Sequence, residues 1–165
     1  MLKHVVLLGV LSSYVSYSWA NDYSYEALVS SFYEMHDDDK KLLRTHLYSK
    51  EWISIGTTNE YNFDMNYRYL KAKTNDIVES WIKTTVEKDL TKDGLSVGDY
   101  TMFLYNFHCS EGSVKLVTYT KYNKAGKNLN SYTSPSYTNF RPVIPETVAE
   151  KLIKAACTYN IIKFS

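Results

Sequence analysis

The sequence predicts an α+β fold: an antiparallel β-sheet of about five to six strands, a C-terminal helix packed on one face, and an N-terminal helical segment. Three observations predict it. Apolar and polar residues alternate with period two through the middle of the chain, apolar residues follow helical spacing at both ends, and the gaps between the late strands are short. Short gaps favour antiparallel hairpins, because parallel neighbours need a long crossover.

The first twenty residues have the features of a signal peptide. Lys3 is followed by the apolar run 5–11, and small residues at Ser18 and Ala20 occupy the positions that signal peptidase reads. The apolar run is too short to span a bilayer, which needs about 20 residues, and the alternative is a buried N-terminal helix. We therefore expect export, a mature chain from Asn21, and no membrane anchor, because no cysteine near the cleavage site could carry a lipid.

The predicted elements follow in order after the cleavage site. Residues 21–48 form a helical extension, with Leu28, Phe32 and Met35 at helical spacing. Residues 49–165 form the main domain, and its strands are expected at 52–57, 61–70, 77–87, 100–109, 114–122 and 128–132.

The C-terminal helix begins at a predicted capping box. Pro145 precedes it, Thr147 is the expected N-cap, and Glu150 stands three residues later to reach back to the backbone. Its apolar stripe ends at Cys157, which gives about eleven residues. An isolated helix of that length is marginal, so it must pack on the sheet.

The two cysteines, Cys109 and Cys157, are expected to form a disulfide bond. An even pair in an exported chain is most simply bridged, and the chain has no C-x-x-C motif. Cys157 lies on the apolar stripe of the helix and Cys109 ends a strand, so the bond would join helix to sheet. Because side chains alternate along a strand, Phe103, Tyr105 and Phe107 share the face of Cys109, under the helix.

Charge and motifs weigh against several functions. The full chain has 19 Lys and Arg residues, and one of them, Lys3, lies in the signal segment. The expected mature chain therefore has 18 basic and 18 acidic residues. That balance does not favour nucleic-acid binding, which draws on clustered cations. The run from His36 to Asp39 lacks the spacing that converges oxygen ligands on a metal ion, so we interpret it as a solvated helix end. We expect no metal and no other cofactor.

No residue pattern indicates an enzyme. His108 and Cys109 are adjacent on a strand and point to opposite faces, so the histidine cannot activate its neighbour. Asp64 and Glu79 could form a carboxylate pair, but nothing in the sequence holds them together. Phosphate-loop, G-x-S-x-G and H-E-x-x-H motifs are absent from the chain.

Two surfaces are candidates for partner binding. The first is the turn after the strand 114–122, where cations and tyrosines crowd together: Tyr119, Lys121, Tyr122, Lys124 and Lys127. Such a tip could meet an acidic partner, or its lysines could simply keep the hairpin soluble and guard an edge strand. The second is the sheet face away from the helix, with Met102, Leu104 and His108. If the N-terminal helices leave it uncovered, it would bind a protein partner or a second copy.

The stretch 52–157 resembles the surface-adhesin protein E family of small exported bacterial proteins. The matching features follow one another along the chain: the strand at Trp52, the tyrosine-rich segment 61–69, the strand with Trp81, the strand closing on Cys109, the turn 123–127, and Pro142 to Pro145 before the helix ending in Cys157. The resemblance implies an antiparallel sheet bridged to a C-terminal helix. It also implies a non-enzymatic role in adhesion to host extracellular matrix proteins, at the surface or in the periplasm of a Gram-negative bacterium. The alternative is a soluble periplasmic accessory or structural protein with no host-binding role.

Overall fold

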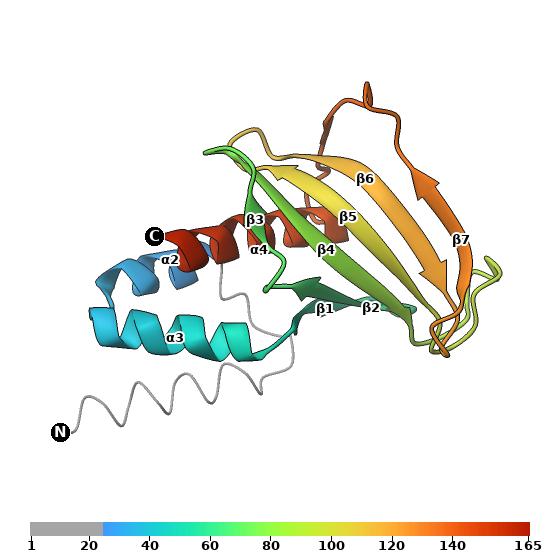
Figure 1. The fold of residues 1–165 in the computed structure, drawn as a ribbon, viewed down its shortest axis with the longest axis horizontal. Coiled ribbons are helices and arrows are strands. Elements are labelled where there is room, and N and C mark those ends of the chain that lie inside the picture. The colour runs from blue at the N-terminus through green and yellow to red at the C-terminus, as the bar shows by residue number, and fades with distance from the viewer. Residues whose placement is uncertain (1–24) are drawn as a thin grey trace.

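The computed structural model describes residues 25–165, so the signal peptide expected at 1–20 lies outside the described residues. The fold is α+β, as predicted (Figure 1). In chain order the elements are α2 (Tyr25–Glu34), α3 (Asp37–Ser49), β1 (Trp52–Thr57), β2 (Tyr61–Asn66), β3 (Lys71–Ala72), β4 (Ile77–Val86), β5 (Tyr100–His108), β6 (Ser113–Tyr122), β7 (Asn128–Thr133), β8 (Arg141–Pro142) and α4 (Val148–Phe164).

The described strands form one antiparallel sheet of eight strands. Six of them run across it in the order β1-β2-β4-β5-β6-β7, and the two-residue strands β3 and β8 pair with β4 and β6. These six long strands correspond to the six predicted from the period-two pattern. The late neighbours β5, β6 and β7 are joined by short turns, as expected for antiparallel hairpins.

Strand β2 ends at Asn66, several residues earlier than predicted. The tyrosine alternation continues through residue 69, but the Asn66 side chain accepts a hydrogen bond from the Tyr69 N–H at 2.9 Å and closes a turn. The Lys163 ammonium then donates to the carbonyls of Tyr67, Arg68 and Leu70 at 2.8–3.1 Å. The segment after β2 is therefore held to the end of α4, and the Tyr69 hydroxyl also donates to the Glu79 carboxylate of β4 at 3.4 Å.

Helix α4 begins where predicted and is longer than predicted. The Thr147 side chain accepts the N–H of Glu150, while the Glu150 carboxylate accepts the N–H of Glu146, one residue before the cap. The helix runs 17 residues to Phe164, past the predicted end at Cys157. Its last turns persist because Ile162 is buried against the N-terminal helices.

The main core lies between α4 and the sheet. Leu152, Ile153, Ala155 and Ala156 of the helix are buried together with sheet residues that include Val78, Ile82 and Phe107. The Cys109–Cys157 disulfide is present, with a Cα–Cα distance of 5.8 Å. Phe103, Tyr105 and Phe107 pack on this core, which confirms that they share the face under the helix. We call this side of the sheet the helix face and the other side the outer face.

The N-terminal extension consists of two helices that pack on α4. Phe32 of α2, Leu43 of α3 and Ile162 of α4 form a second, smaller core, and the Arg44 guanidinium donates to the Ile162 carbonyl at 2.7 Å. Figure 1 shows α2 and α3 beside the C-terminal end of α4, away from β5, β6 and β7. None of the described helices therefore covers the outer face.

Candidate functional site

Helix α4 covers only part of the helix face, and a groove of about 460 Å³ lies beside its first turns. Strands β2, β4, β5 and β6 form the floor. Val148, Ala149 and Leu152 of α4 line one side, and Asp93 and Leu95 of the β4–β5 loop (residues 87–99) line the other. The disulfide contributes to this arrangement, because it fixes α4 to the end of β5 and leaves the other half of the face open.

Four aromatic rings form a continuous surface from the groove to the edge of the sheet. Phe103, Tyr119 and Tyr132 lie side by side on β5, β6 and β7 in one cross-strand row. Their ring centroids are 5.8 and 5.6 Å apart, and Phe103 stacks on Tyr105 at 5.7 Å. Tyr132 is 45% exposed at the outer end. We call these four residues the aromatic floor.

The Tyr105 hydroxyl adds a polar group to this floor. Burial raises the pKa of Tyr105, so the side chain stays neutral over the physiological range. The described residues supply no hydrogen-bond partner for this hydroxyl, although the ring lines the groove, stacks on Phe103 and contacts Phe107 at a tilt of 47°. A ligand in the groove can therefore pair with it.

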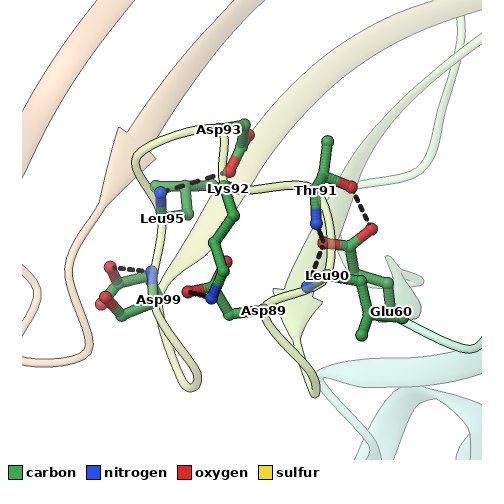
Figure 2. Close-up of polar contacts among 9 residues, drawn as sticks. Glu60, Asp89, Leu90, Thr91, Lys92, Asp93, Leu95 and Asp99 are labelled. Carbon is green, nitrogen blue, oxygen red and sulfur yellow. Dashed lines mark hydrogen bonds and ion pairs between the residues drawn. The ribbon is translucent and has the colours of Figure 1, made fainter.

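Carboxylates hold the β4–β5 loop in place. In Figure 2 the Glu60 carboxylate, from the β1–β2 turn, faces Leu90 and Thr91; it accepts their N–H groups at 3.0 and 2.7 Å and also the Thr91 hydroxyl. The hydrogen bond from the Thr91 hydroxyl is the main reason why the pKa of Glu60 is lowered. The loop is therefore a fixed wall of the groove.

Asp93 joins the same loop to the sheet. Its carboxylate pairs with the Lys121 ammonium at 3.2 Å and accepts the Leu95 N–H at 3.2 Å. Partial burial by itself would raise the pKa of Asp93, but the hydrogen bonds from Lys121 and Leu95 outweigh it and hold the pKa below its ordinary value. The groove therefore contains a compensated ion pair and no free cation at Lys121.

Asp99 connects the loop to the turn between β6 and β7. It is buried, and its two carboxylate oxygens accept the N–H groups of Ser96 and Lys124, both at 2.9 Å. These bonds bring the β4–β5 loop and the predicted lysine tip into one unit.

Replacing Asp99 with alanine should loosen this unit. We expect amide exchange at Ser96 and Lys124 to accelerate at least tenfold, because a lost hydrogen bond to a charged group is worth about 1.5–3 kcal/mol. Hydrogen exchange followed by NMR measures it. Asp89→Ala is the matched control, since Asp89 pairs with the exposed Lys92 in the same loop. Unchanged exchange at Lys124 in Asp99→Ala would contradict this role.

The structure divides the predicted tip cluster between two faces. Tyr119 and Lys121 lie on the helix face with the groove, whereas Tyr122 lies on the outer face and stacks on Tyr100 at 5.1 Å. Lys124 and Lys127 stand in the turn itself. The analysis of the sequence missed Phe103, Tyr105 and Tyr132 as parts of one site; only the period-two alternation of β6, which separates Tyr119 from Tyr122, could have indicated the division.

The other chemical candidates are not assembled. Asp64 lies opposite Lys83, four residues along β4 from Glu79, so the two carboxyl groups are about 13 Å apart along the strand. A glycosidase pair needs roughly 5–9.5 Å. His108 faces Asp76 at 3.2 Å, and the N–H and hydroxyl of Ser110 donate to that same carboxylate, so the histidine contacts the acid and not the serine hydroxyl. Within residues 25–165 no group of three or more His, Cys, Asp or Glu is placed to hold a metal ion.

The outer face carries mixed chemistry and is only partly exposed. Leu104 is buried between its cross-strand neighbours Trp81 and Thr118, so the predicted apolar patch is smaller than the sequence indicated. Lys83 lies over the Tyr100 ring at 4.8 Å. The helix face, with its groove and continuous aromatic floor, is the better candidate site.

A sheet bridged to one helix, with an aromatic groove beside that helix, has the features of a domain that binds a partner. The chain belongs to the Surface-adhesin protein E family, whose family model matches residues 52–158. The matched region begins at β1 and ends within α4, so it contains the whole groove and the disulfide. No curated protein and no solved structure matches the chain.

Family membership gives the protein an adhesin-like function and indicates an exported or surface location. It also implies that other proteins are the partners. Across residues 25–165, no helix is both long and apolar enough to cross a membrane.

Proposed function

We propose that the protein is an exported adhesin-like protein that binds a host extracellular matrix protein through the aromatic groove. The observation that carries this proposal is the continuous aromatic floor, which begins beside α4 and reaches the exposed edge of the sheet at Tyr132. The family supplies the class of partner, a protein. The nature of that partner, a matrix protein, is the part that the experiment below must test.

The groove has the properties of a binding hot spot. Tyrosine is enriched among the residues that dominate interface energies, because its ring buries a large apolar area while the hydroxyl pairs with the partner. Phe103 and Tyr105 are half-buried already, so little side-chain freedom is lost when a partner covers them. A volume of about 460 Å³ accommodates a few side chains of one segment, not a whole domain.

Truncating the two tyrosines of the floor that lie nearest the sheet edge should weaken binding strongly. We expect the double variant Tyr119→Ala/Tyr132→Ala to bind immobilised laminin and vitronectin at least thirtyfold more weakly than the unmodified chain 21–165, because two hot-spot tyrosines together contribute about 2 kcal/mol or more. Surface plasmon resonance measures the affinities. Tyr137→Ala is the matched control, since Tyr137 is 81% exposed and lies outside the groove.

Two results would overturn the proposal. One is the absence of saturable binding to every matrix protein tested, which would favour a periplasmic accessory role. The other is equal binding by the double variant and the control, which would place the site elsewhere. Circular dichroism must first show that both variants are folded.

The lysines of the turn belong to the rim of this site in our proposal. Lys124 and Lys127 lie in the turn that follows β6, whereas Lys121 lines the groove and is already paired with Asp93. Rim charges mainly change association rates and their salt dependence. In the triple variant Lys121→Ala/Lys124→Ala/Lys127→Ala, association should slow more than dissociation accelerates.

Location is tested separately. Treating intact Gram-negative cells that express the chain with protease should remove the protein if it is displayed at the surface, as an adhesin requires. Protection until the outer membrane is opened would place it in the periplasm and favour the alternative role.

A further inference from the structure

We propose that β7 receives the partner as an added β-strand: an extended, uncharged segment of the partner protein pairs with the free edge of β7, and its alternate side chains lie on the aromatic floor. This inference rests on the proposed function of the groove and specifies the form of the ligand. Three features of β7 carry it.

The first feature is a row of free backbone groups. β7 pairs with β6 on one side, and no described strand pairs with it on the other. The Ser134 N–H donates to the Val117 carbonyl at 2.9 Å, in register with the pairs that join β7 to β6. Because alternate residues of an antiparallel strand turn toward the same neighbour, the N–H groups of Ser131 and Thr133 point to the free edge. Such a row of backbone groups is a template for pairing with another strand.

The second feature is the absence of an edge guard. Natural edge strands are usually protected by charged side chains, proline, bulges or a covering element. All six residues of β7 are exposed and none is charged. The irregularity in its pairing lies near Asn128, which leaves the part from Asn130 to Thr133 regular. At the opposite edge of the sheet, Ile55 and Gly56 of β1 are buried.

The third feature is continuity with the aromatic floor. A strand added beside β7 would lie about 4.8 Å away, so the residue opposite Tyr132 would extend the row of Phe103, Tyr119 and Tyr132. An apolar or aromatic residue fits that position. The residues before and after it in the partner segment would point to the outer face, beside the hydroxyl groups of Ser131 and Thr133. The segment therefore alternates apolar and small polar residues, and β7 offers no counter-charge for a charged one.

A peptide library tests this inference directly. Twelve-residue peptides displayed on phage are selected against the chain 21–165, and enriched sequences are synthesised. We expect uncharged alternating peptides that bind Thr133→Pro at least tenfold more weakly than Thr133→Ala. Proline removes the outward N–H and is tolerated at such edge positions, and the alanine variant keeps the N–H. On the unmodified chain, a saturating peptide should slow amide exchange at Ser131 and Thr133 at least tenfold, a readout that needs no variant.

Several results would overturn it: no enriched peptide, equal binding by the two Thr133 variants, or no protection at Ser131 and Thr133. Concentration-dependent dimerisation that Thr133→Pro abolishes would assign the edge to a second copy of the chain.

The two proposals can fail separately. Matrix binding that is lost in Tyr119→Ala/Tyr132→Ala but kept in Thr133→Pro would leave the groove in place and remove the added strand.

Discussion

Replacing both Cys109 and Cys157 with alanine should lower the free energy of unfolding by about 4 kcal/mol. The bond closes a loop of 48 residues, and the chain-entropy relation gives that magnitude for such a loop. For a domain whose total stability is typically about 5–15 kcal/mol, this is the largest single contribution that we identify. Urea denaturation of the oxidised wild-type chain and of the double variant measures the difference.

The same variant should also bind its partner less tightly, because the disulfide holds α4 beside the groove. Val148, Ala149 and Leu152 line the groove and depend on the placement of that helix. Reduced wild-type protein is the control, and its stability should match that of the variant. A loss of less than about 1 kcal/mol would show that packing alone fixes α4.

Raising the pH above 10 should destabilise the fold strongly. Burial is the main reason that the pKa values of Tyr67 and Tyr159 are raised from 10 to about 12, and burial also raises the pKa of Tyr25. Below pH 10 these tyrosines are protonated in both states, so their contribution to stability is fully present. Between about pH 10 and 12 the unfolded chain loses these protons while the folded chain keeps them, so stability falls by about 2 kcal/mol for each buried tyrosine.

Tyr67→Phe provides the decisive comparison for this effect. The Tyr67 hydroxyl is buried, and the described residues offer it no hydrogen-bond partner. Removing it should leave stability at pH 7 unchanged or slightly higher, and it should reduce the loss between pH 10 and 12. Thermal melts at pH 7, 10 and 11.5 test both statements, with Tyr137→Phe as an exposed control. Identical alkaline curves for wild type and Tyr67→Phe would contradict the assignment.

The architecture could be predicted because its signals are local. Period-two alternation identified the six long strands, and the position of Cys157 on an apolar stripe identified the helix that faces Cys109. Two boundaries were wrong, one for a local reason and one for a tertiary reason. The tyrosine alternation after Asn66 continues in the sequence, but a side-chain hydrogen bond ends the strand, and the last turns of α4 persist because Ile162 meets Phe32 and Leu43.

The groove could not be predicted in the same way because its parts are distant in sequence. The tip was noticed for its local charge, yet Lys121 is paired with Asp93, 28 residues away. The aromatic floor combines one row across three strands, so recognising it requires the register that joins Phe103 to Tyr119 and Tyr119 to Tyr132. A sequence alone gives the alternation along each strand but not which residues of neighbouring strands stand opposite one another.

Hydrogen–deuterium exchange of the chain 21–165, with and without saturating matrix protein, shows whether a protein partner binds in the groove on the helix face. We expect slower exchange in β6, β7 and the β4–β5 loop, and unchanged exchange in α2, α3 and β1. Protection confined to α2, α3 or β1, with β6 and β7 exchanging as in the free protein, would contradict it.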